Sequence, residues 1–326
     1  MDSLLPSVAS APPVRVVYIG GCGRSGSTLL DRMLGELPRV CSVGELRFIW
    51  QRGLVENQRC GCGKPFRDCP FWRAVGDEAF GGWDTLDASE MAALERATDR
   101  HRYIPFLIAP WLWPGYRRRL THYTRVLAQL YRGINRATGG GLIVDSTKDP
   151  PFAFLLRHVP GIDLRVVHLV RDSRGVAFSW TKRIRKPEKV DTVDFMNTYH
   201  PVEMGFRWMA FNLCFHLLER LGVARLSMRY EKIVTYPRAE IERVAEYVGD
   251  EFADDDFAFL HGEGVDLGIH HTVSGNPMRF DQGTILLALD EAWKTQLQPL
   301  HRRLVSIFTF PLLLCYGYLR PARARQ

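Results

Sequence analysis

A glycine-rich turn between an apolar run and a helical pattern constrains the fold of this chain more than any other feature. The apolar run before the turn consists of β-branched and aromatic residues: Val14, Val16, Val17, Tyr18 and Ile19. Such a run, ended by Gly20 and Gly21, is typical of a buried parallel strand. Gly23 and Gly26 let successive backbone N–H groups point inward, and a helix opens at Ser27. The stretch therefore predicts a strand, an anion-binding loop and a helix.

The spacing of the turn almost matches the P-loop of nucleoside triphosphate-binding proteins. Gly21 is followed by four residues and then Gly26, but Ser27 stands where that motif has its lysine. Arg24 supplies a cation within the turn, and its planar guanidinium suits oxyanions held side by side. The turn is thus predicted to bind phosphate without triphosphate and magnesium chemistry. The simpler alternative is a strand-turn-helix in which the Gly and Ser residues only serve the turn.

Three further apolar runs predict strands that alternate with helical segments. One begins at Leu142, one spans residues 164–170, and one ends at Tyr230. Asp145 and Lys148 follow the apolar start of the first of these runs, where the carboxyl end of a strand forms the ligand edge of a doubly wound sheet. The pattern predicts an α/β fold: a P-loop-like, doubly wound parallel sheet flanked by helices.

Size and composition favour one domain with inserted loops. A chain of 326 residues with 46% hydrophobic content can bury a sizeable core. Residues 14–319 are predicted to form the domain, between a flexible tail at 1–13 and a basic tail at 320–326. Within the domain, residues 45–135 are predicted to be an insertion that carries helices and a cysteine loop at residues 59–72. One of these helices is predicted to start at the D-x-x-E pattern of residues 87–90.

Charge and the ends of the chain bear on partners and location. The net charge of +7 suits an acidic ligand or an anionic membrane face, and no nucleic-acid-binding signature accompanies it. Residues 1–15 lack the basic start and apolar core of a signal peptide, so we expect a cytoplasmic protein. Residues 304–319 are apolar but are broken by Pro311 and are shorter than the ~20 residues of a spanning helix. We expect a buried terminal segment, while the basic tail behind it leaves peripheral membrane contact open.

Three of the seven cysteines are clustered, at Cys60, Cys62 and Cys69. They could hold zinc together with a fourth ligand from elsewhere, form a disulfide, or remain plain thiols in a turn-rich loop. The C-x-C-x6-C spacing matches no standard zinc pattern, so no metal site is predicted.

Four short motifs occur in an order that resembles one known family. They are RSGST at residues 24–28, GE at 44–45, KDP at 148–150, and VRD at 170–172 with Ser179 behind it. In this order they resemble the sulfotransferases that use 3′-phosphoadenosine-5′-phosphosulfate (PAPS), above all the tyrosylprotein and bacterial small-molecule branches. The resemblance extends over residues 14–249. It implies an enzyme that transfers a sulfuryl group from PAPS to a hydroxyl of a small molecule, glycan, lipid or tyrosine.

The resemblance also assigns donor-binding residues by position. It implies that the loop holds the 5′-phosphosulfate through Arg24, Ser25, Gly26, Ser27 and Thr28. It implies that Arg171 and Ser179 bind the 3′-phosphate. Further nucleotide contacts are implied at Arg183, Tyr230, Gly275, Asn276 and Arg279. Ser274, in the same late loop as Gly275 (residues 268–280), would assist the transition state.

Glu45 is the predicted general base for the acceptor hydroxyl, because the chain returns after the loop helix and could bring this carboxylate beside the sulfuryl group. The resemblance implies the same role. Arg24 and Lys148 would stabilise the bridging oxygen during in-line displacement, so no divalent ion is required. Alternatively, Glu45 could simply pair with its neighbour Arg47.

Histidines are rival bases. His168 lies within a predicted strand and is expected in the core, whereas His200, His270 and His271 fall in polar segments and stay open as candidates. Acceptor specificity is expected from the Trp-rich residues 104–113 and from the basic and polar flap at 181–201.

Two other functions remain open at this stage. A P-loop phosphotransferase or kinase would need a magnesium-binding acid, for which Asp145 is the only clear candidate, and it would normally carry the missing loop lysine. A non-catalytic nucleotide-binding scaffold would keep the fold without the chemistry. The presence of both Glu45 and Lys148 argues against that loss of function. The oligomeric state is not predicted.

Overall fold

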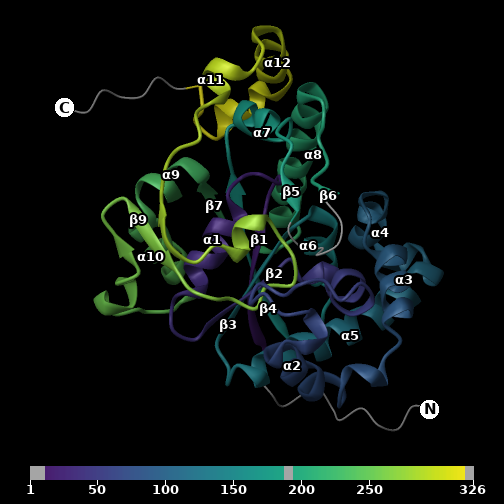
Figure 1. Cartoon of the computed structure of the whole chain (residues 1–326). Helices are drawn as coiled ribbons and strands as arrows, with labels where there is room; N and C mark the ends of the chain where they lie inside the picture. Colours follow the sequence, from purple (N-terminus) through teal and green to yellow (C-terminus); the bar gives the residue numbers. More distant parts are fainter. Residues whose placement is uncertain (1–11, 187–193, 320–326) are drawn as a thin grey trace.

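The computed structural model describes residues 12–186 and 194–319. A sheet of five parallel strands lies at its centre, in the order β2-β3-β1-β4-β7 (Figure 1). The strands are β1 Val14–Gly20, β2 Val40–Gly44, β3 Leu142–Lys148, β4 Ile162–Val170 and β7 Ala224–Arg229. From β1 the chain adds β2 and β3 on one side of that strand and then β4 and β7 on the other, so the predicted doubly wound α/β fold is confirmed. Such a sheet places ligands at the carboxyl ends of the strands beside the switch point.

One strand of this sheet was not predicted. The sequence indicated four strands, whereas β2 adds a fifth at the edge, paired only with β3 within the sheet. The strand has five residues, and its sequence VCSVG contains only two β-branched residues. So short a run gives little strand signal, and its pairing with β3 decides its conformation.

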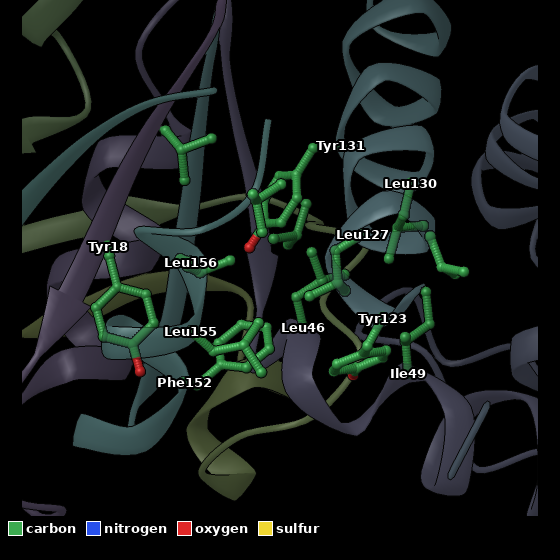
Figure 2. Packing of buried hydrophobic residues seen from close by; sticks show 14 of the residues in the cluster. Tyr18, Leu46, Ile49, Tyr123, Leu127, Leu130, Tyr131, Phe152, Leu155 and Leu156 are labelled. Atoms are coloured by element: carbon green, nitrogen blue, oxygen red, sulfur yellow. The ribbon is translucent and has the colours of Figure 1, made fainter. Parts of the chain in front are cut away.

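The residues of β1 alternate between the two faces of the sheet. Val14, Val16 and Tyr18 belong to a core that includes side chains of α5 (Pro114–Ala137) and α6 (Pro150–Leu156). Figure 2 shows part of this core, in which Tyr18 lies near Phe152 of α6 and other side chains come from α5. Val17 and Ile19 belong to the opposite core, together with residues of α1 (Ser27–Gly35) and α10 (Pro237–Val248). Burial on both faces fixes β1, and with it the position of the loop that follows.

The remaining helices and strands surround this frame. The other helices are α2 Pro70–Phe80, α3 Ala88–Thr98, α4 Ile104–Ile108, α7 Ser173–Ser179, α8 Pro201–Arg220, α9 Tyr230–Thr235, α11 Trp293–Gln296 and α12 Pro299–Cys315. The minor strands are β5 Arg185–Lys186 paired with β6 Asp194–Phe195, and an antiparallel sheet of β8 Leu260–His261, β9 Gly264–Leu267 and β10 Gly283–Leu286. The predicted start of α3 is confirmed, because the carboxylate of Asp87 accepts hydrogen bonds from the N–H groups of Ser89 and Glu90.

The terminal helix α12 differs from its prediction in two ways. It runs through Pro311 without a break, and only one side of it is buried, through Val305, Thr309, Leu312 and Leu313. Packing of this side against α7 and α8 offsets the ~3 kcal/mol that an internal proline costs a helix. Other apolar side chains on the helix, such as Ile307 and Phe310, are exposed. Within the described residues, no helix combines the length and apolar character needed to cross a membrane.

Candidate active site

The glycine-rich loop lies between β1 and α1 at the carboxyl edge of the sheet. Three of its residues have positive φ: Gly21 at 143°, Arg24 at 71° and Gly26 at 89°. Gly26 directly precedes α1, and no described side chain caps the helix there, so its first N–H groups are available to an anion. A Cβ atom on Gly26 would lie 2.6 Å from Cδ2 of Tyr230. Only glycine therefore fits at this point of the loop.

Arg24 places a guanidinium beside the loop with part of its hydrogen-bonding capacity unused. Its Cζ lies 5.1 Å from the centre of the Trp180 ring, and its Nη2 lies 3.0 Å from the sulfur of Met196. Its Nε is buried without a hydrogen-bond partner among the described residues. Burial lowers the pKa of Arg24, and the nearby carboxylate of Glu45 acts in the opposite direction. A half-buried cation with a buried, unpaired donor atom suits an anionic ligand.

A cavity of about 380 Å³, which we call the loop cavity, opens over this loop. Most of the predicted site residues line it: Arg24, Gly26, Ser27, Thr28, Glu45, Lys148, Arg171, Ser179, Tyr230 and Asn276. Arg171 lies at its far side, with Cζ 4.6 Å from the centre of the Tyr230 ring and Nη1 donating to the carbonyl of Arg24 at 3.1 Å. Ser179 ends α7 and lines the same cavity. One space thus brings the loop together with Arg171 and Ser179.

Two charged residues that line the loop cavity, Lys182 and Asp290, were not among the predicted donor-binding residues. Asp290 accepts from Nη2 of Arg171 at 3.2 Å and from Nζ of Lys182 at 3.1 Å, and all three residues line the cavity. Partial burial would raise the pKa of Asp290, but the hydrogen bonds and charges of Lys182 and Arg171 lower it overall. Asp290 lies 119 residues after Arg171 in the chain, so no local pattern links the two.

Other predicted site residues lie outside the walls of the loop cavity. Arg183 instead places its Cζ 4.0 Å from the centre of the Phe195 ring, and its neighbour Lys182 lines the cavity. Arg279 is buried and donates to the carbonyls of Thr272 and Arg59, each at 2.8 Å. Its guanidinium thereby joins the late loop to the cysteine loop. Ser25 is also buried outside the cavity walls.

Glu45 and Lys148 form an ion pair at the edge of the loop cavity, joining Oε1 to Nζ. Arg52 lies close by, with Nη1 4.0 Å from Oε2 of Glu45. The hydroxyl of Ser274 donates to the same oxygen at 3.4 Å and accepts from Arg52. Burial would raise the pKa of Glu45, but Lys148 and Arg52 together hold it below its ordinary value. The carboxylate is therefore ionised and can accept a proton once a cation withdraws.

The alternative pairing of Glu45 with Arg47 is wrong. The Arg47 guanidinium forms ion pairs with three other carboxylates, those of Glu95, Asp99 and Asp149. Its Nε lies 2.6 Å from Oδ2 of Asp99, which is fully buried. The three carboxylates neutralise the Arg47 guanidinium and occupy its donors. Glu45 instead forms its ion pair with Lys148.

A second cavity, of about 340 Å³, adjoins the first. The residues that line both are Gly23, Glu45, Lys148, Trp180 and Met196. Aromatic rings of Phe48, Tyr199 and Phe211 and the cations of Arg52 and Arg207 line the second cavity, which also includes Gly275. The Glu45–Lys148 pair thus borders both the loop cavity and the second cavity.

Of the two segments predicted to set acceptor specificity, only the flap at 181–201 contributes residues to the second cavity. Met196, Asn197 and Tyr199 of the predicted flap line the second cavity, whereas residues 187–193 of that flap lie outside the described residues. No residue of 104–113 lines it. That passage forms α4 and a short 3-10 turn instead.

The histidines proposed as rival bases lie away from both cavities. His200 packs against the ring of His301, and His270 shares a hydrogen bond with Glu36 at 2.7 Å. His271 lies beside the clustered cysteines. His168 is buried and hydrogen-bonded to Asn212, as expected for a core residue. His101, which the sequence did not single out, lines the second cavity.

Asp145 is held in the interior by hydrogen bonds. Its carboxylate accepts from the hydroxyl of Tyr131 at 2.7 Å and from the N–H of Thr147 at 2.9 Å. Burial raises its pKa to about 6, since the charged form is poorly solvated there. A carboxylate so engaged argues against the magnesium-binding role that a phosphotransferase would need.

Solved structures of known proteins share the fold of this chain. The sulfotransferase domain of the olefin synthase from Synechococcus PCC 7002 is similar in fold, with a TM-score of 0.51 and 21% identity over 92% of this chain and 96% of that one. The sulfotransferase domain of the curacin biosynthetic pathway matches with a TM-score of 0.49 and 16% identity, over 93% and 98%. Sulfotransferase STF9 from Mycobacterium avium matches with a TM-score of 0.45 and 14% identity, over 77% and 68%. No curated protein is similar enough in sequence to count as a match.

A family model described as "Sulfotransferase family" matches residues 16–254, which is more than half of the chain. The matched region includes the loop, Glu45, Lys148, Arg171 and Ser179. The chain is therefore a member of the sulfotransferase family.

Proposed function

We propose that this enzyme transfers the sulfuryl group of PAPS to an acceptor hydroxyl, with Glu45 as the general base. The observation that carries this proposal is the position of the Glu45–Lys148 pair, which lines both the loop cavity and the second cavity. A transfer enzyme needs a donor site and an acceptor site that share their reacting groups. The two cavities meet that requirement at these two residues.

The residues of the loop cavity fit PAPS. The unpaired Nε of Arg24 and the uncapped start of α1 suit the phosphosulfate, and Arg171 with Ser179 suits the 3′-phosphate. Tyr230, which lines the same cavity, would contact the nucleotide. PAPS would supply the sulfuryl group and leave as 3′-phosphoadenosine-5′-phosphate (PAP).

Glu45 would take the proton of the acceptor hydroxyl while the hydroxyl oxygen forms its bond to sulfur. While Lys148 is paired with Glu45, the pKa of the carboxyl stays low, which makes it a weak base. When Lys148 turns to the negative charge that develops on the bridging oxygen, that restraint is reduced and Glu45 becomes more basic. The pair would thus couple stabilisation of the leaving group to proton removal.

The second cavity suggests the chemistry of the acceptor. Phe48, Tyr199 and Phe211 offer ring surfaces, while Arg52 and Arg207 bring positive charge. Cζ of Arg52 also lies 4.0 Å from the centre of the Phe48 ring, and the guanidinium is close to Glu45. An aromatic alcohol or phenol with an acidic group would match both features.

The test is a PAPS-dependent transfer assay with Glu45→Gln. Wild-type enzyme should form PAP and a sulfated product from members of a panel of phenols, tyrosyl peptides, sugars and lipid alcohols. Because the amide cannot accept the proton, turnover of Glu45→Gln should fall by a factor on the order of 100 or more, with PAP affinity retained.

Glu56→Gln is the matched control, since Glu56 is exposed and lies in the same segment as Arg52. It should leave turnover unchanged. Unchanged turnover in Glu45→Gln would remove Glu45 as the base, and an absence of PAP formation with every acceptor would contradict the proposed reaction.

A further inference from the structure

The clustered cysteines meet a histidine from a distant part of the chain. Cys60, Cys62, Cys69 and His271 each offer one ligand atom, and all four atoms lie within 4.8 Å of one another. The sulfurs of Cys62 and Cys69 are 3.7 Å apart, and Nδ1 of His271 lies 3.2 Å from the sulfur of Cys69 and 3.9 Å from that of Cys60. None of the four residues lines the loop cavity or the second cavity.

We propose that this cluster binds one zinc ion at a structural site. Zinc bonds of ~2.3 Å to sulfur and ~2.0–2.1 Å to nitrogen place tetrahedral ligands roughly 3.5–3.8 Å apart, close to the separations found here. Three thiolates and an imidazole are a usual zinc set. With four protein ligands the metal has no open position for a reactant, so its role is structural.

The surroundings hold the ligands in place. The ring of His271 stacks on Phe71, with centroids 5.0 Å apart and planes inclined by 13°. Its carbonyl accepts from the indole N–H of Trp72 at 2.9 Å. A Cβ atom on Gly61 would lie 2.4 Å from the carbonyl oxygen of His270, so glycine allows the cysteine loop to approach the histidine segment. Such orientation of ligands by neighbouring groups is typical of a metal site.

A disulfide fits this cluster less well. Cysteine sulfurs in a disulfide are ~2.05 Å apart, whereas the Cys62 and Cys69 sulfurs are 3.7 Å apart and all three cysteines are unbonded. A disulfide between any two would also leave the third thiol and the imidazole unexplained. A single metal ion accounts for all four side chains.

The zinc would fasten the late loop to the active site. His271 is three residues before Ser274, whose hydroxyl contacts Glu45. The segment between them joins the cysteine loop and the end of β2 through three backbone bonds: Gly61 N–H to Thr272 O at 2.9 Å, Val273 N–H to Val43 O at 2.9 Å, and Glu45 N–H to Ser274 O at 3.2 Å. Metal binding would therefore fix the backbone on which Glu45 and Ser274 lie.

The test measures metal directly. Untagged full-length protein, purified under reducing conditions without added metal, should contain about one zinc per chain by mass spectrometry of the metal content. Cys69→Ser and His271→Ala should lower that content at least fivefold. Cys214→Ser, in which a thiol outside the cluster is replaced, should keep it.

A second measurement on the wild type covers the case in which these variants fail to fold. Removal of zinc by a chelator should lower the Tm and make three further thiols reactive. Reconstitution with Co²⁺ should give the visible absorption of a tetrahedral cobalt–thiolate site. A folded wild type that contains no zinc, with its cluster as free thiols or as a disulfide, would overturn the proposal. So would equal zinc content in Cys69→Ser, His271→Ala and wild type. Neither outcome depends on sulfuryl transfer.

Discussion

Arg24 and Lys148 share an unusual backbone conformation at the centre of the site. Among the described residues, four that are not glycine have positive φ, and these two account for half of them, at 71° and 64°. The left-handed conformation costs a non-glycine residue of order 1–2 kcal/mol, so it persists only where the surroundings enforce it. Both residues place a cation at the loop cavity. The strain lies where the proposed donor would need charge.

Asp290 is the residue whose replacement tests the charge balance of that cavity. Its carboxylate pairs with Arg171 and Lys182, and it would repel a bound phosphate. Asp290→Asn should therefore tighten PAP binding by about threefold to tenfold in isothermal titration. Glu291→Gln, a change at an exposed neighbour, should have no effect. Weaker binding in Asp290→Asn would show instead that Asp290 is needed to orient Arg171.

At the scale of elements, the strand-loop-helix unit of β1 and α1 is what gives the site its form. Parallel neighbours on both sides hold β1, and its end fixes the loop against Tyr230. β3 and β4 end at the same edge and present Lys148 and Arg171. The site is thus formed by residues at the ends of parallel strands, and it depends on the conformation of the loop after β1.

Gly26→Ala tests this dependence. Alanine at φ 89° is strained, and its Cβ would meet the Tyr230 ring at 2.6 Å, so the loop must shift. PAP affinity should fall at least about tenfold, measured by calorimetry. Gly115→Ala is the matched control, because nothing lies within 4 Å of a Cβ there. PAP binding by Gly26→Ala at wild-type strength would mean that the loop does not hold the nucleotide.

The motifs predicted the site residues that lie within short sequence patterns. They did not predict features that depend on contacts between segments far apart in the chain. Arg24 and Lys148 could be placed from the sequence because each lies at or just after the end of a recognisable strand, and Ser179 could be placed through the order of motifs that resembles the family. β2 could not, since its five residues owe their conformation to β3. His271 meets Cys69 across 202 residues of chain, and spacing alone does not reveal such a meeting.

The sequence does not show which of two adjacent basic residues faces the ligand. Lys182 lines the loop cavity and Arg183 does not, because the chain turns at the end of α7 and sends adjacent side chains in different directions. Arg279 was predicted near the nucleotide; it donates to the carbonyls of Thr272 and Arg59 and is not among the residues that line the loop cavity. Sequence identifies such cations, but only the packing shows which of them face the ligand.

At the scale of the whole molecule, a doubly wound sheet carries the loop cavity at its carboxyl edge, and the second cavity adjoins it. The cysteine loop and the late loop are joined by a backbone hydrogen bond between Gly61 and Thr272, and the proposed zinc site would fasten them there. The family model shows that this enzyme is a sulfotransferase, and the proposed transfer from PAPS depends on the donor site in the loop cavity.

Equilibrium titration with PAP, AMP and ATP–magnesium tests that donor site most directly. PAP differs from AMP only by the 3′-phosphate, which Arg171 and Ser179 are proposed to bind. PAP should therefore bind at least about tenfold more tightly than AMP, and Arg171→Ala should abolish most of that difference. Equal affinity for PAP and AMP, or preferred binding of ATP with magnesium, would contradict the account.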